Sequence, residues 1–132
     1  MPSDIDKTLP GAQRTAMIWT VIQVAVGGAI GSVLRYGMVA AVGAPVGTLV
    51  VNVLGSLVMG VLFVVLSGRA GLSPLLMAGV LGGFTTFSAF SLDAMKLWEG
   101  GRLQALGYVA ASVILSLAAV AFGAAVAKGA VG

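Results

Sequence analysis

The chain contains no cysteine and no histidine, and it has only four acidic residues in 132. These absences exclude disulfides, thiol nucleophiles, imidazole bases and zinc sites built on cysteine or histidine. Charged residues make up 8% of the sequence, whereas an average soluble domain has about 25%. So few charged residues cannot cover the water-exposed surface of a soluble globular enzyme. The net charge of +3 includes no basic run, which argues against nucleic acid as a partner.

Apolar sequence, in contrast, is abundant: 59% of the residues are hydrophobic, and the mean hydropathy is +1.11. A bilayer core of about 30 Å needs roughly 20 apolar residues per helix, and four such stretches are separated by turns rich in glycine and proline. Lipid requires backbone groups to be satisfied internally, which favours helices. We therefore predict an all-α integral membrane protein with four transmembrane helices. They form a membrane domain at 15–128, with helices at about 15–42, 46–67, 72–98 and 103–127, after a disordered polar tail at 1–14.

Basic residues are divided almost equally between the two predicted sides of the membrane. Four spans place both termini on one side, which then holds Lys7, Arg14, Arg69 and Lys128. The other side holds Arg35, Lys96 and Arg102. A clear bias normally sets orientation. Its absence reflects either too few charges to decide or insertion in both orientations as an antiparallel dual-topology dimer. A two-fold dimer would also enclose a pathway more easily than four helices alone.

Small residues recur at a spacing of four in every predicted helix, and this spacing predicts close packing between helix backbones. The pairs are Gly27 and Gly31, Ser56 and Gly60, Gly79 and Gly83, and Ala119 and Gly123.

The segment from Gly82 to Thr86 predicts a break in the middle of the third helix. Two adjacent glycines beside two threonines are poor helix formers. A break would free carbonyl oxygens, which are hard ligands suited to Na⁺ or K⁺. Alternatively, the glycines allow a close helix contact while the threonine hydroxyls bond back to the chain. From the glycine pair onwards, Phe84, Phe87 and Phe90 recur every three residues, so we expect them on one helical face. That face either packs against lipid or another helix, or presents positive ring edges to an anion.

Other polar residues in the spans also have two interpretations. Asn52 either makes an interhelical hydrogen bond or offers its amide to an anion. Hydroxyls spaced by four share one face of the fourth helix and could replace the hydration of a small anion along its path; these are Tyr108, Ser112 and Ser116. Arg35 is either a snorkelling anchor or part of an electropositive vestibule. We expect Asp93 and Lys96 at the membrane surface, where they could pair.

Three segments together resemble the Fluc (CrcB) family of fluoride-specific ion channels: Gly27–Tyr36, Gly47–Ser56 and Gly82–Ser91. The resemblance extends from about residue 24 to 127. It implies an antiparallel dual-topology dimer with two fluoride pores and a central structural sodium ion. A homodimer is expected, although some members pair non-identical subunits.

The resemblance also implies a role for individual residues. The main-chain carbonyls of Gly82 and Thr85 would hold Na⁺. The fluoride pore would include Asn52, Phe87, Phe90 (but not Phe84), Tyr108, Ser112, Ser116 and Arg35. The chain departs from the family pattern at Asp93, where some relatives have Glu, and at Ala89, where Thr is common.

The implied function is passive, fluoride-selective export of cytoplasmic fluoride across a bacterial inner membrane, by a multi-pass protein that is not an enzyme. The alternative is a small dual-topology multidrug exporter. A proton-coupled exporter needs a membrane-embedded carboxylate, and the first predicted helix has none. A third interpretation, a membrane scaffold, explains the small residues but leaves the aligned polar and aromatic residues unexplained.

Overall fold

The computed structural model describes residues 10–69 and 71–132, and every regular element within these ranges is a helix. In chain order the elements are α2 (Gly11–Val42), α3 (Val46–Val65), η1 (Pro74–Leu81), α4 (Gly82–Phe84), α5 (Phe87–Gly100) and α6 (Arg102–Val131). The consecutive elements η1, α4 and α5 make up one span. In the described ranges, four helical segments are long and apolar enough to cross a membrane. The prediction of an all-helical chain with four such segments is confirmed.

The helix ends differ slightly from those predicted. The first helix begins at Gly11, directly after Pro10, so residues 11–14 are helical although we expected them in the tail. The remainder of that expected tail, residues 1–9, lies outside the described residues. The turn after α2 contains Gly43, whose φ of 89° favours glycine. The third span extends to Gly100, and α6 follows after a single residue.

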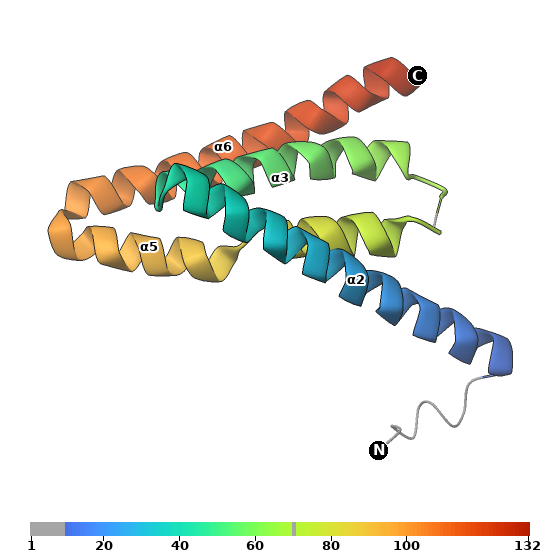
Figure 1. Ribbon diagram of the computed structural model, residues 1–132. Coiled ribbons are helices and arrows are strands. Elements are labelled where there is room, and N and C mark those ends of the chain that lie inside the picture. The colour runs from blue at the N-terminus through green and yellow to red at the C-terminus, as the bar shows by residue number, and fades with distance from the viewer. Residues whose placement is uncertain (1–9, 70) are drawn as a thin grey trace.

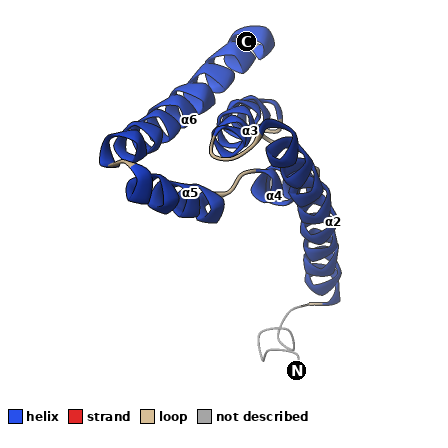
Figure 2. Cartoon of the chain, turned by 60° about the vertical axis from the view of Figure 1, so that its left-hand side comes forward, coloured by secondary structure: helices blue, strands red, loops and turns tan. Residues whose placement is uncertain are grey.

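The helices alternate in direction, so short connections lie at both ends of the bundle (Figure 1). The connection between α3 and η1 lies at the same end as the C-terminus and the start of α2, while the turns after α2 and α5 lie at the other end. The central element is α3 (Figure 2). It packs along α6, and α2 packs along η1 and α4. This arrangement places α3 between the fourth helix and the interrupted third span.

Glycines mediate the closest helix contacts, as the small-residue spacing predicted. A Cβ atom at Gly60 would clash with the carbonyl oxygen of Val120, and one at Gly123 would clash with the carbonyl oxygen of Leu57. The helices α3 and α6 therefore approach with backbone against backbone, which is how helices pack when lipid is as apolar as their side chains.

We predict that Gly123→Ala destabilises the protein, because the added methyl group must push α6 away from Leu57. Overpacking of this kind costs about 1–3 kcal/mol. Gly107→Ala on the same helix is the control, since a Cβ there meets nothing within 4 Å. Thermal unfolding in detergent, followed by circular dichroism, should show a lower midpoint for Gly123→Ala alone. Equal midpoints would contradict the close α3–α6 contact.

Candidate functional site

The third span loses helical geometry at Thr85 and Thr86, which separate α4 from α5. Both residues have extended backbones, with φ and ψ of −84° and 155° at Thr85 and −151° and 122° at Thr86. The Thr86 hydroxyl oxygen caps the new helix by accepting from the N–H of Ala89 at 3.1 Å. The interruption therefore follows the glycine pair after one residue, Phe84, and lies within the segment where the sequence predicted it.

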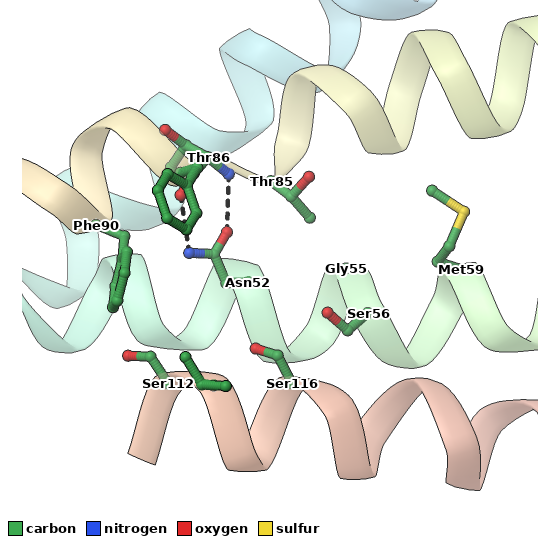
Figure 3. Close-up of a pocket in the computed structure, with 11 residues that line it drawn as sticks. Asn52, Gly55, Ser56, Met59, Thr85, Thr86, Phe90, Ser112 and Ser116 are labelled. Carbon is green, nitrogen blue, oxygen red and sulfur yellow. Dashed lines mark hydrogen bonds between the residues drawn. The ribbon is translucent and has the colours of Figure 1, made fainter. Parts of the chain in front are cut away.

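The Asn52 side chain on α3 takes over the hydrogen bonds of the interrupted backbone. Its Oδ1 accepts from the Thr86 N–H at 2.8 Å, and its Nδ2 donates to the Thr86 carbonyl at 2.9 Å (Figure 3). The interhelical hydrogen bond is therefore present in the structure. An amide nitrogen carries two hydrogens, so this pairing occupies one Nδ2 donor position and the second hydrogen is a further donor.

Arg35 also reaches the interruption, from α2. Its Nε donates to the Gly83 carbonyl at 2.9 Å, and the residue is half-buried. Neither interpretation of Arg35 from the sequence, as an anchor or as part of a vestibule, anticipated this contact. The guanidinium satisfies a carbonyl on the last turn before the break, where charge-assisted hydrogen bonds are strong.

A pocket of about 310 Å³ lies between α3, α6 and the interruption. Its lining includes five of the predicted pore residues: Asn52, Phe87, Phe90, Ser112 and Ser116. It also includes residues that the sequence alone did not assign to a pore: Gly55, Ser56, Met59, Thr85, Thr86 and Val113. The helical spacing from Asn52 was a usable signal for two of these, because Ser56 and Met59 follow it by four and seven residues on the same face. Figure 3 shows these side chains facing the same space.

The phenylalanines do not share one helical face, so that prediction is wrong. The extended residues between α4 and α5 separate Phe84 from the other two, and the Phe84 ring lies against Gly55 on α3. Phe87 and Phe90 face the pocket, with ring centroids 5.3 Å apart and planes tilted by 53°. Phe90 is buried, whereas Phe87 is 77% exposed in the single chain.

The three hydroxyls predicted on the fourth helix lie on α6, but only two line the pocket. Ser112 is 5% exposed, and its Oγ has no hydrogen-bond partner within residues 10–69 and 71–132. Buried hydroxyls normally have a partner, so Ser112 is a donor available to a bound group. Tyr108 stands beyond the pocket, with its ring 5.4 Å from that of Phe90 and its hydroxyl 3.5 Å from Asp93 Oδ2.

Asp93 is buried at 8% exposure and lines a second pocket beside Pro45 and Lys96, near the turn after α2. Its place at the membrane surface stays a prediction. The Thr48 hydroxyl donates to Asp93 Oδ2 at 2.6 Å, and the Tyr108 hydroxyl reaches the same oxygen. The sequence favoured pairing with Lys96 because the two residues are three apart. The tertiary fold instead turns this face of α5 towards α3 and α6.

The two expected sodium ligands lie at the interruption. Gly82 is exposed there, and the Thr85 carbonyl accepts no backbone hydrogen bond from the described part of the chain. The Thr85 hydroxyl instead bonds back to the Leu81 carbonyl at 2.9 Å. No group of three acidic, histidine or cysteine side chains suited to a metal occurs in the described ranges.

Comparison with known proteins identifies the family. Residues 22–124 match the family model described as "CrcB-like protein, Camphor Resistance (CrcB)". The chain belongs to the CrcB family. The resemblance inferred from the three sequence segments is thereby confirmed.

Curated relatives of this CrcB chain carry the name "Fluoride-specific ion channel FluC". The protein from Paracoccus denitrificans is 54% identical over 118 residues, covering 83% of this chain and 95% of the relative. Those from Cereibacter sphaeroides and Ruegeria sp. are 51% and 52% identical, and each alignment covers 86% of this chain and 98% of the relative. These names describe a channel and not an enzyme. These names and the four apolar helices together show that the CrcB chain is a multi-pass membrane protein.

We predict that Arg35→Met destabilises this CrcB protein by about 1.5–3 kcal/mol, because a charge-assisted hydrogen bond to the Gly83 carbonyl is lost. The matched control is Arg102→Met, whose guanidinium lies 5.3 Å from the centre of the exposed Trp98 ring. Thermal unfolding in detergent measures both variants. If Arg35 acts only by attracting anions, Arg35→Met will slow anion flux and leave the unfolding midpoint unchanged.

Proposed function

We propose that the chain is a passive, fluoride-selective channel that exports cytoplasmic fluoride and so relieves its toxicity. The observation that carries this proposal is the pocket lined by neutral donors and two phenylalanine rings, with the unpartnered Ser112 hydroxyl buried in its wall. The names of the relatives support the choice of fluoride as the ion.

Fluoride crosses by exchanging its hydration shell for fixed neutral donors. The second Nδ2 hydrogen of Asn52 and the hydroxyls of Ser112 and Ser116 are available along the pocket wall. The rings of Phe87 and Phe90 have positive edges that stabilise an anion without a formal charge. Weak, distributed binding of this kind allows the ion to leave as well as enter. Arg35 holds the interruption in place through its hydrogen bond to the Gly83 carbonyl. Tyr108 is the last residue of the hydroxyl series at one end of α6.

Selectivity over chloride follows from a narrow path lined with hydrogen-bond donors, because fluoride is the smaller ion and the stronger acceptor. The direction of flow follows the electrochemical gradient. When acid outside a bacterial cell drives HF inward, fluoride is released in the cytoplasm, and a channel in the inner membrane lets it out.

The working unit in this proposal is an antiparallel dual-topology dimer with two pores, in which the interruption lies in mid-membrane. Three observations support it. Phe87 is 77% exposed although it belongs to the pocket wall, so one chain leaves the wall incomplete. The interruption lies near the middle of the 27-residue segment Pro74–Gly100. Basic residues show almost no bias between the two sides. We propose a homodimer; a paired non-identical subunit is the other arrangement.

We further propose that the Gly82 and Thr85 carbonyls of two subunits hold a structural sodium ion at the dimer centre. The available carbonyl of Thr85 and the exposed position of Gly82 suit this role. When bound, the ion supplies a fixed positive charge to main-chain oxygens that the interruption leaves without helical partners.

Sodium should stabilise the dimer if these carbonyls bind it. We predict that the thermal midpoint of the purified dimer in detergent rises with NaCl and not with choline chloride at equal ionic strength, because choline is too large for a carbonyl site. Potassium chloride provides the comparison between the two alkali cations. A midpoint that is the same in all three salts would reject the sodium site.

The buried carboxylate of Asp93 is the observation that favours the alternative, a proton-coupled multidrug exporter. Asp93 does not line the main pocket and is already bonded to Thr48 at 2.6 Å. The first span, α2, contains no acidic residue. An exchange of protons for drugs needs a carboxylate that the substrate can reach, so the fluoride channel is the better-supported function.

The aromatic residues of the pocket provide a direct test. We predict that Phe87→Ile abolishes fluoride efflux from proteoliposomes, measured with a fluoride-selective electrode, because the ring edge is lost while the size and apolar character are largely kept. Phe122→Ile is the control, since Phe122 is 64% exposed on α6 and does not line the pocket. Both variants should elute like the wild type. Unchanged efflux with Phe87→Ile would reject the assigned pore, and rapid chloride efflux from the wild type would reject the selectivity.

A further inference from the structure

The hydroxyls in and beside the helices of this chain differ in their hydrogen bonding, and two groups of them are informative. One group bonds back to a carbonyl four residues earlier, which is the usual state of serine and threonine inside helices; its members are Thr15, Thr20, Thr85 and Ser91. The other group lines the pocket and makes no hydrogen bond to any described residue; its members are Ser56, Ser112 and Ser116. Ser56 is the member that neither the family resemblance nor the proposed mechanism uses.

Ser56 lies on the wall of the pocket that faces α6. It is one helical turn after Asn52 on α3, and it is half-buried. Figure 3 shows the Ser56 and Ser116 side chains extending from α3 and α6 towards the same space. One turn further along α3, the apolar side chain of Met59 also lines the pocket. Ser56 therefore offers a polar group on α3 between the Asn52 amide and an apolar end.

We propose that the Ser56 hydroxyl donates a hydrogen bond to the permeating anion, so that α3 and α6 form two opposed donor walls. The proposal rests on the proposed fluoride function and adds a residue to it. One turn beyond the Asn52 amide, donors on α6 alone would satisfy one side of a desolvated ion and leave the other against apolar atoms, which is costly for an anion. A hydroxyl on α3 supplies the second side. The ligand class is a small, strongly hydrated anion that is a good hydrogen-bond acceptor.

The test compares Ser56→Ala with Ser73→Ala in proteoliposomes. Ser73 is the matched control because its hydroxyl donates to Met77 Sδ at 3.4 Å and it does not line the pocket. Alanine is the best helix former, so Ser56→Ala should fold, and elution volume and circular dichroism verify this. We expect Ser56→Ala to slow fluoride efflux about two- to tenfold, the effect of losing one neutral hydrogen bond, while Ser73→Ala matches the wild type.

A double variant tests whether the two walls act on the same ion. If Ser56 and Ser116 bind one anion together, the loss in Ser56→Ala/Ser116→Ala should differ from the product of the two single losses. If the wild type passes fluoride and Ser56→Ala passes it at the same rate or faster, the role of Ser56 is overturned. The channel function then stays intact. Losses that simply multiply would overturn the shared site. A wild-type chain that passes no fluoride would overturn the proposed function, and this proposal with it.

Discussion

Thr86 lies where the third span leaves helical geometry, and both of its backbone polar groups bond to the side-chain amide of Asn52. A carboxamide has the same donor and acceptor as a peptide group, so Asn52 substitutes for the helical partners that the interruption removes. In an apolar environment an unpaired backbone group costs several kcal/mol. The extended residues are therefore tolerated because this pairing exists. Arg35 supports the preceding turn in the same way through the Gly83 carbonyl.

This pairing determines the geometry of the pocket. Because Thr86 is fixed to α3, α5 starts at a defined place, and Phe87 and Phe90 on its first turn face α3 and α6. The close glycine contacts at Gly60 and Gly123 hold α3 against α6, so the pocket walls on these two helices have a fixed separation. These walls carry the hydroxyls of Ser56, Ser112 and Ser116 together with the apolar side chains of Met59 and Val113.

Much of this architecture could be predicted from the sequence, because lipid imposes simple rules. Long apolar stretches specify the helices, and the Gly-Gly-Phe-Thr-Thr segment specifies the interruption through poor helix propensity. Local periodicity failed where the interruption intervened, as with Phe84. It gave no signal for the burial of Asp93, because that burial depends on Thr48 and Tyr108, which lie 45 and 15 residues away in the chain. The contact between Arg35 and Gly83 spans 48 residues and has no local signal.

A buried carboxylate close to a pathway for anions requires a physical account. Asp93 Oδ2 receives the Thr48 hydroxyl at 2.6 Å and lies 3.5 Å from the Tyr108 hydroxyl, so neighbouring donors offset its charge locally. The Phe90 ring lies beside Tyr108 and lines the pocket itself, whereas Asp93 does not line it. Of the three hydroxyls on α6, Ser112 and Ser116 line the pocket. Asp93 joins α5 to α3 through Thr48 and to α6 through Tyr108, and this polar contact fixes the position of α5.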